Sequence, residues 1–173
     1  PLFSAAIQTY LQSIMRNIFL YLLFAVALSA QQATAAPNKA PDISLPAAGG
    51  MVQLDDLSGK VIYLDFWASW CGPCRKENPN VVEAFKKFNK KGFTVLGVSL
   101  DRPNDKDKWL KAIEDDGLTW THVSDLQFWD NEVAKQYGIR SIPSNLLVGK
   151  DGKILAKNLR GEDLHTELAK LLK

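Results

Sequence analysis

Two mostly apolar runs of strand-forming residues, 61–67 and 93–100, lie in the middle of the 173-residue chain. Runs of this length are typical of strands buried on both faces of a sheet. Between them, apolar positions recur at helical spacing after Cys74: Val81, Val82, Phe85 and Phe88. The pattern therefore predicts strand, helix, strand, with the helix ending before Gly92.

Shorter periodic segments surround this unit. We expect a strand over 51–54, a helix over 105–116, a strand over 119–123, a helix over 131–137, a hairpin of strands 145–148 and 153–157 around Asp151-Gly152, and a closing helix over 162–172. Residues 37–46 are polar and rich in Pro and Ala, which favours a linker. The order β-α-β-α-β-α-β-β-α predicts an α/β fold with a mixed sheet and helices on both of its faces.

The N-terminal 36 residues follow a different pattern. Met15-Arg16-Asn17 precedes an uncharged, mostly apolar stretch at 18–30, and small residues follow, with Ala33 and Ala35 in an A-x-A arrangement. This pattern predicts a secretory signal peptide over 15–36. The apolar stretch is short for a bilayer span of about 20 residues, which disfavours the alternative of an uncleaved anchor. We interpret 1–14 as an upstream translated segment and 37–173 as one domain.

Composition and charge exclude several classes. With 46% hydrophobic and 23% charged residues the chain is ordinary for a globular protein, which argues against disorder. The net charge of +2 is too small to imply a nucleic acid or an anionic membrane surface as partner. We expect a monomer without a nucleic-acid partner.

The only two cysteines, Cys71 and Cys74, stand two residues apart where the predicted helix begins. The free N–H groups and the dipole of a helix N-terminus stabilise a thiolate there. We expect Cys71, before the first turn, to be the exposed nucleophile. Cys74, inside the first turn and more buried, would then resolve the mixed disulfide. Pro73 suits this place because it costs no hydrogen bond at the head of a helix.

The pair has two other possible uses, in a zinc site or in a structural disulfide. A zinc site needs two further ligands, and the only histidines, His122 and His165, lie on distant segments. We therefore expect no metal and no cofactor besides the redox-active Cys71–Cys74 disulfide. A purely structural disulfide remains an alternative.

Two motifs carry a resemblance to a known family. Residues 65–74 resemble the active-site strand and loop of thioredoxin; they read Asp-Phe-Trp-Ala-Ser-Trp-Cys-Gly-Pro-Cys. Residues 137–143 resemble its cis-proline loop; they read Tyr-Gly-Ile-Arg-Ser-Ile-Pro. The insertion between them, the exported leader and Arg75-Lys76-Glu77 resemble the periplasmic TlpA/ResA-type thiol–disulfide oxidoreductases. The resemblance covers about 41–172. It implies a thioredoxin fold with a strand–helix insertion and an N-terminal extension.

The resemblance also implies a substrate surface around the disulfide. Ile142 and Pro143 would face it, joined by a cis peptide bond, and a substrate chain would add there as a short strand. Trp70, Gly72 and Pro73 would complete this surface, with Trp70 as a flat apolar contact. The alternative for Pro143 is an ordinary trans proline at a strand edge.

Two carboxylates are candidates for proton transfer. Asp65 matches the buried acid of thioredoxin, and a pKa raised by burial would let it take a proton from Cys74. Glu77 matches an acid beside the active site of ResA-like proteins. The alternatives are a hydrogen-bonded core aspartate and a first-turn glutamate stabilised by the helix dipole.

The function implied by the resemblance is an exported, periplasmic oxidoreductase of a Gram-negative bacterium that reduces disulfides in substrate proteins. The Gly-Pro dipeptide is similar to that of thioredoxin, at about −270 mV, and not to DsbA-type oxidants, at about −120 mV. A reductant outside the cytoplasm implies a membrane-bound thiol electron donor, and relatives of this type serve cytochrome c maturation or general disulfide reduction.

Three other functions compete with this one. A thiol peroxidase would need Pro-x-x-x-Thr-x-x-Cys, and 61–71 offers no such Pro and Thr. A docking module with a structural disulfide and a protein that acts as an oxidant stay open.

Overall fold

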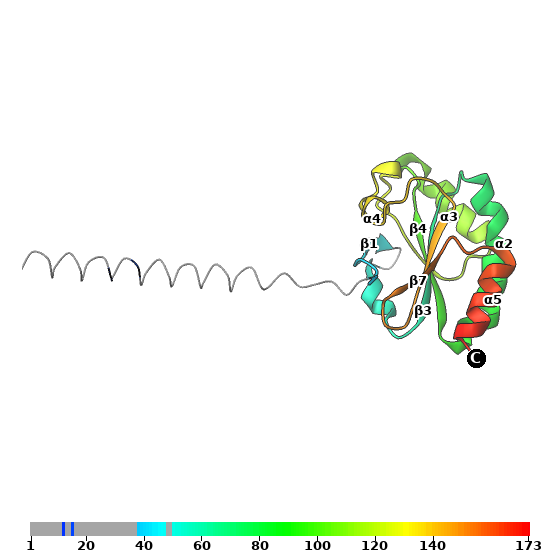
Figure 1. Ribbon diagram of the computed structural model, residues 1–173. Coiled ribbons are helices and arrows are strands. Elements are labelled where there is room, and N and C mark those ends of the chain that lie inside the picture. Colours follow the sequence, from blue (N-terminus) through cyan, green and yellow to red (C-terminus); the bar gives the residue numbers. More distant parts are fainter. Residues whose placement is uncertain (1–11, 13–14, 16–37, 48–49) are drawn as a thin grey trace, which may run out of the picture. The chain divides into compact units, whose positions relative to one another are not determined.

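The computed structural model describes residues 12, 15, 38–47 and 50–173, of which Asn38–Lys173 form one compact unit (Figure 1). Apart from residues 12 and 15, the predicted upstream segment 1–14 and signal peptide 15–36 lie outside the described residues. Among the helices that the structure describes, none combines the length and apolar character that crossing a bilayer requires.

A seven-stranded mixed sheet forms the centre of this unit. Its strands are β1 (Ser44–Ala47), β2 (Gly50–Gln53), β3 (Val61–Trp67), β4 (Phe93–Ser99), β5 (Thr121–Val123), β6 (Ser144–Val148) and β7 (Ile154–Lys157). They lie in the order β2-β1-β5-β4-β3-β6-β7. β3, β4 and β5 are parallel to one another, whereas β1, β2, β6 and β7 pair antiparallel with their neighbours. The predicted mixed sheet is confirmed.

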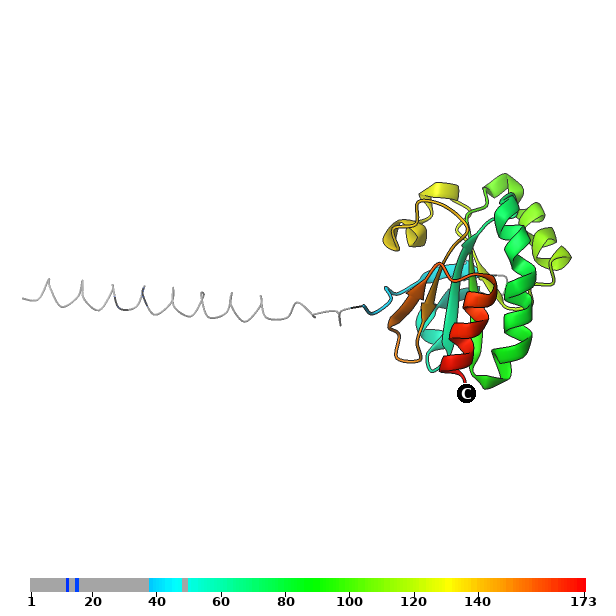
Figure 2. The same cartoon turned by 45° about the vertical axis from the view of Figure 1, so that its right-hand side comes forward.

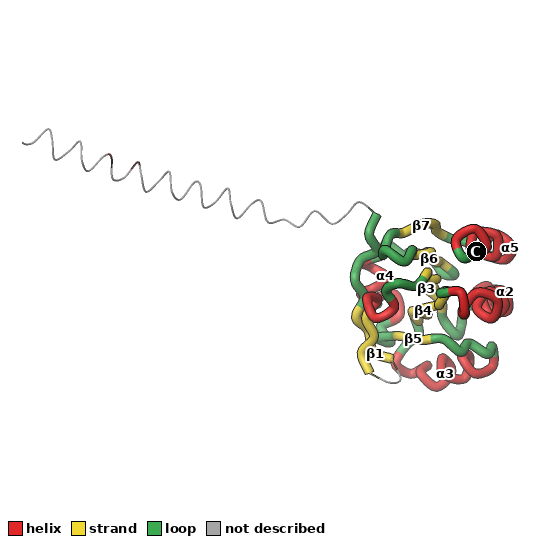
Figure 3. The backbone as a smooth tube through the Cα atoms, turned by 90° about the horizontal axis from the view of Figure 1, so that it is seen from below, coloured by secondary structure: helices red, strands yellow, loops and turns green. Residues whose placement is uncertain are grey.

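Helices cover both faces of the sheet. They are α2 (Gly72–Phe88), α3 (Lys106–Asp115), α4 (Glu132–Gln136) and α5 (Gly161–Leu171), with single 3-10 turns at η1 (Leu54–Leu57), η2 (Asn89–Lys91), η3 (Pro103–Asp105) and η4 (Phe128–Asp130). Viewed along the strands, α5, α2 and α3 line one face and α4 lies on the other (Figure 3). The closing helix α5 runs beside α2, which it contacts (Figure 2).

The central strands confirm the apolar pattern. Every residue of β3 is buried, because β4 pairs with it on one side, β6 on the other, and helices cover it. Leu64, for example, lies between Leu96 and Leu146. Gly92, at φ 93°, ends the turn after α2 in a left-handed conformation that only glycine adopts without strain, as the sequence indicated.

The predicted linker over 37–46 is wrong for its second half. Residues 44–47 form β1, which pairs with β2 as a hairpin and continues the sheet beside β5. Ala40, Ile43 and Leu45 are buried in the core. The alternation of Ile43 and Leu45 with polar residues is a strand signal, but the neighbouring prolines and alanine made it hard to recognise. The segment forms a strand because it pairs with β5, which is distant in the sequence.

A close contact across the sheet depends on Gly97 in β4. A Cβ atom added there would lie 2.4 Å from His122 Nδ1 and 3.1 Å from Trp67 Nε1. The Trp67 and His122 rings, from the two neighbouring strands, lie edge to face with centroids 5.5 Å apart. Only glycine leaves room for both rings on this face.

We therefore expect Gly97→Ala to lower the free energy of unfolding by roughly 1–3 kcal/mol, because both rings must move. Urea denaturation measures this change. Gly72→Ala is the matched control, since a Cβ atom at Gly72 meets nothing within 4 Å. Equal stability of the two variants would contradict the contact.

Candidate active site

Cys71 and Cys74 form a disulfide where the chain leaves the central strand β3 and enters α2. The two Cα atoms lie 5.2 Å apart. Cys71 is the N-cap of α2, and its Sγ accepts the backbone N–H of Cys74 at 3.2 Å. A helix N–H that points at this sulfur stabilises negative charge there, as a thiolate requires.

Both cysteines are buried, which corrects the expectation of an exposed Cys71. Cys71 is 4% exposed and Cys74 is 2% exposed. The Cys71 sulfur is bonded to the buried Cys74 sulfur and accepts the Cys74 N–H, and both residues belong to the hydrophobic core. The exposed surface of the loop belongs to its neighbours Trp70, Gly72 and Pro73.

Trp70 is the largest apolar side chain of that surface. It is 45% exposed, and its ring lies 5.4 Å from the Phe128 ring in η4. A half-exposed indole braced by a second ring offers a flat apolar contact. Trp67, in contrast, is 1% exposed and packs in the hydrophobic core.

The Ile142–Pro143 peptide bond is cis, as the resemblance implied. Ser144, the next residue, pairs with Phe66, so the loop lies beside the end of β3 from which the cysteine loop departs. Arg160 Nη2 donates a hydrogen bond to the Pro143 carbonyl oxygen at 2.5 Å. The orientation of Ile142 and Pro143 toward a docked substrate stays a prediction.

Asp65 is a buried acid in the middle of β3, between Gly97 and Asn145 of the neighbouring strands. Its pKa is raised from the ordinary 3.8 to about 7, and burial is the largest cause. The negative charge of Glu77 contributes to this rise, and the positive charge of Arg160 partly opposes it. At neutral pH the group is therefore able both to accept and to release a proton.

Glu77 is tied into the fold through α5. Its Oε1 accepts the Gly161 N–H at 2.7 Å, at the start of α5, and its Oε2 accepts an Asn80 side-chain N–H at 3.2 Å. A carboxylate at a helix N-terminus is stabilised by the free N–H groups there. Glu77 thus fixes α5 against α2, and its negative charge also makes the electrostatic potential at Asp65 more negative.

The segment before α5 holds the parts of the site together. Leu159 N–H donates to Asn145 Oδ1 at 2.9 Å, and Asn145 Nδ2 donates to the Leu159 carbonyl at 3.0 Å. The Tyr63 hydroxyl donates to the same carbonyl at 2.9 Å. Together with Arg160 and Gly161, these bonds connect β3, the cis-proline loop and α2.

Sequence reasoning missed a second buried acid, Asp101. It is fully buried, and its carboxylate accepts three hydrogen bonds: from Ser69 N–H at 3.0 Å, Ser69 Oγ at 2.5 Å and Ser99 Oγ at 2.7 Å. Ser69 lies two residues before Cys71, so Asp101 fixes the loop that carries the nucleophile. The available signal was an acid directly after an apolar strand, and nothing in the local sequence reveals its distant partner.

Arg75 was also given no role by the sequence. Its guanidinium forms a two-bond ion pair with Asp116, which lies at the end of α3, and Asn78 donates to the same carboxylate at 2.6 Å. The pair connects the first turn of α2 to the inserted helix. As for metals, no group of three or more ligand-type side chains suited to an ion occurs among the described residues.

This geometry defines a class of protein. A two-cysteine disulfide at the N-terminus of the helix after the central strand, with a cis-proline loop at the end of the neighbouring strand, is the site of a thiol–disulfide exchange protein of thioredoxin fold.

The chain matches the AhpC/TSA family over residues 36–157 and belongs to that family. It is similar to the thiol–disulfide oxidoreductase ResA of Geobacillus thermodenitrificans, with 32% identity over 152 residues, 86% of this chain and 84% of the relative. It is also similar to ResA of Bacillus subtilis, with 26% identity over 78% of this chain and 73% of the relative.

Solved structures agree. The thioredoxin domain of a thiol–disulfide oxidoreductase from Bacteroides vulgatus is 38% identical with a TM-score of 0.73, over 82% of this chain and all of that domain. A thiol–disulfide oxidoreductase from Bacteroides fragilis is 38% identical with a TM-score of 0.71, over 78% of this chain and 99% of that one. The predicted thioredoxin fold and ResA-type relationship are confirmed, and the protein is a thiol–disulfide oxidoreductase.

The raised pKa of Asp65 predicts a pH-dependent stability. Between pH 3.8 and about 7 the folded protein keeps this carboxyl protonated while the unfolded chain ionises it, so its contribution to stability falls as pH rises through this window. Asp65→Asn has no carboxyl group to ionise and therefore lacks this loss. As pH rises through the window, we expect the free energy of unfolding of Asp65→Asn minus that of the natural protein to increase by up to roughly 4 kcal/mol and then to level off. Urea denaturation at each pH measures the difference.

Glu77→Gln is the companion variant, because the amide oxygen is still able to accept the Gly161 N–H. Removing the negative charge should move the Asp65 titration to lower pH. A difference between Asp65→Asn and the natural protein that is independent of pH would contradict a buried acid with a raised pKa.

The Asp101 network predicts an effect on both folding and the loop. In Asp101→Asn an NH2 donor replaces one acceptor oxygen, so the three present hydrogen bonds cannot all be kept, and we expect a loss of roughly 1–3 kcal/mol in the free energy of unfolding. We also expect the reduced protein to react more slowly with a substrate disulfide, since Ser69 no longer holds the Cys71 loop. Asp107→Asn, an exposed position on α3, is the control. The proposed anchoring fails if both variants match the natural protein.

Proposed function

We propose that this oxidoreductase works outside the cytoplasm as a reductant of disulfides in substrate proteins. The observation that carries the proposal is the Cys71–Cys74 disulfide at the N-terminus of α2, with Gly-Pro between the cysteines. The same dipeptide occurs in thioredoxin, whose potential of about −270 mV lies well below the −120 mV of DsbA-type oxidants.

The reaction has two exchange steps. The Cys71 thiolate attacks a substrate disulfide, forming a bond between Cys71 and one substrate sulfur while the other leaves as a thiolate. Cys74, after losing its proton, attacks Cys71 Sγ, which releases the second substrate thiolate and closes the 71–74 disulfide. Two electrons pass to the substrate, and two protons complete its thiols.

Asp65 is the proposed acceptor of the Cys74 proton. Its pKa of about 7 lies close to that of an activated thiol, so proton transfer in either direction costs little free energy near neutral pH. The substrate is proposed to lie over Trp70, Gly72 and Pro73 and along Ile142 and Pro143, as an added strand. Closing the cycle needs a thiol electron donor, and for an exported protein we propose a membrane-bound one.

Export rests on the sequence pattern of 15–36, a basic start, a short apolar core and an A-x-A site. We propose that the substrates are exported proteins, with cytochrome c maturation or general disulfide reduction as the process served. A fusion of residues 1–36 to alkaline phosphatase, which is active only outside the cytoplasm, tests export in a Gram-negative host. We expect the fusion to be active. An inactive fusion would refute it.

The direction of electron flow is tested by the reduction potential of the 71–74 pair, measured in thiol redox buffers. We expect a value nearer −270 mV than −120 mV. A value near −120 mV would make the protein an oxidant.

The roles of the two cysteines are tested with insulin as substrate. Cys71→Ser should abolish disulfide reduction, whereas Cys74→Ser should trap a mixed disulfide with the substrate that dithiothreitol releases, because the resolving thiol is gone. Failure of both reduced cysteines to react with iodoacetamide would leave only a structural disulfide. Turnover of hydrogen peroxide without insulin reduction would instead favour the thiol peroxidase.

A further inference from the structure

Three side chains from separate segments form a stack beside the cysteine loop. The ring centroids of Trp70, directly before Cys71, and Phe128 lie 5.4 Å apart. The Arg102 guanidinium lies over the Phe128 ring, 3.8 Å from its centroid, well within the range of about 6 Å for a cation–π contact. The stack therefore places a positive charge at the edge of the surface on which the substrate is proposed to lie.

The backbone holds Phe128 in a conformation that a bulky residue rarely adopts. Its φ is 55°, in the left-handed region. Its N–H donates to the Asp101 carbonyl oxygen at 3.3 Å, which ties η4 to the segment after β4. Such strain persists only where the surrounding structure imposes it, and it is concentrated at functional sites. Here it holds one ring against both Trp70 and Arg102.

A hollow of about 350 Å³ beside this stack is bordered by four cationic side chains, of which Arg102 is one. Arg102 is exposed and forms no ion pair with any residue that the structure describes. The carboxylate of the neighbouring Asp101 is buried and bound by Ser69 and Ser99. The other three cations are paired with aspartates, as Arg75–Asp116, Lys108–Asp105 and Lys111–Asp115.

An exposed guanidinium that rests on an aromatic ring is suited to a carboxylate. Its planar fork of N–H groups matches the two carboxylate oxygens. Because the ring already orients the side chain, less conformational freedom is lost when an ion pair forms. Since Trp70 adjoins the nucleophile, a carboxylate that reaches Arg102 belongs to a residue near the substrate's disulfide.

We propose that Trp70, Phe128 and Arg102 form a docking surface for acidic segments of substrate proteins. Arg102 binds a carboxylate that lies close in sequence to the disulfide under attack, and the two rings contact the neighbouring apolar part of the substrate. This inference rests on the proposed reduction of substrate disulfides by Cys71, and it names the class of substrate that the site prefers.

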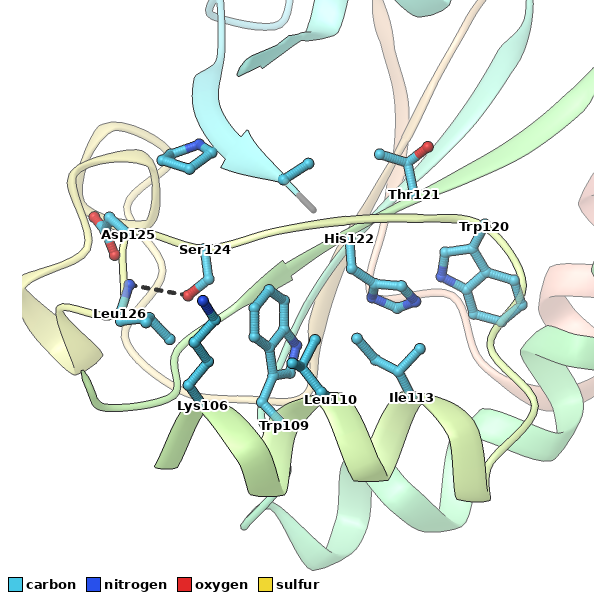
Figure 4. Close-up of a pocket in the computed structure, with 12 residues that line it drawn as sticks. Lys106, Trp109, Leu110, Ile113, Trp120, Thr121, His122, Ser124, Asp125 and Leu126 are labelled. Carbon is cyan, nitrogen blue, oxygen red and sulfur yellow. Dashed lines mark hydrogen bonds between the residues drawn. The ribbon is translucent and has the colours of Figure 1, made fainter. Parts of the chain in front are cut away.

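The other side of α3 supplies a control position. A cavity of about 690 Å³ lies there, between α3 and β5, and Figure 4 shows Lys106 and Asp125 among the side chains that line it. Lys106 is exposed like Arg102 and lies four residues after it, but it does not border the hollow beside Trp70. Lys106→Gln therefore removes an equal charge from outside the proposed docking surface.

Pairs of peptides test the preference on the reduced, full-length protein. Each peptide is joined through its cysteine to the same neutral thiol, and one residue within three positions of that cysteine is either Glu or Gln. At one or more of these positions we expect the Glu peptide to be reduced about threefold to fivefold faster at low salt. The difference should shrink at high salt, because an exposed ion pair is screened. Chromatography of the released thiol gives the rates, each divided by the rate with dithiothreitol.

Charge variants locate the contact. Arg102→Gln should lose the preference and still reduce the Gln peptides at the natural rate, whereas Lys106→Gln should keep it. Arg102→Glu should reverse it, so that a Lys peptide reacts faster than the Glu peptide. On the natural protein a Lys peptide should be the slowest of the three, which keeps the proposal testable if a variant does not fold.

Three results would overturn the docking surface: equal rates for the Glu and Gln peptides at every position, a preference that survives in Arg102→Gln, or an equal loss in Lys106→Gln. Reduction of the Gln peptides without a preference overturns this inference alone. Failure to reduce any peptide overturns the proposed reductase function as well.

Discussion

Strand β3 is the constraint on which the structure depends. It has no exposed residue, and it is paired with β4 along all seven residues and with β6 along five. Two-sided pairing fixes its position, so the loop that follows it is delivered to one place at the edge of the sheet. The cysteine pair, the buried acid and the cis-proline loop all take their positions from this strand or from its neighbour β6.

The pKa of an acid in such a buried strand is raised. Asp65 stands among apolar side chains, and burial contributes more to its raised pKa than any nearby charge. Glu77 and Arg160 then adjust the pKa in opposite directions from the start of α2 and the segment before α5. Because Glu77 also binds the Gly161 N–H, the same side chain links the packing of α5 to the proton affinity of the site.

The inserted helix α3 is connected to the active site on one side and encloses a cavity on the other. Asp116, at its end, pairs with Arg75 in the first turn of α2, and Asp101, before it, holds Ser69. On its opposite side, Trp109 faces the cavity that Trp120 and His122 also line. A chain of aromatic contacts leads from Trp120 through His122 to Trp67, at the base of the cysteine loop.

The sequence by itself determined the order of the elements from β3 onward, the redox pair and the class of fold, because long buried strands, helix periodicity and Cys-Gly-Pro-Cys are local signals. Tertiary structure decided what local signals do not contain. The β1 hairpin is ordered by pairing to β5, Cys71 is buried within the hydrophobic core, and Asp101 gains its function only when β4 brings it to Ser69. The packing of His122 likewise depends on Gly97, whose missing side chain leaves room for the imidazole ring. In each case the deciding contact joins residues far apart in the chain or depends on a side chain's final orientation, and neither is encoded in periodicity or spacing.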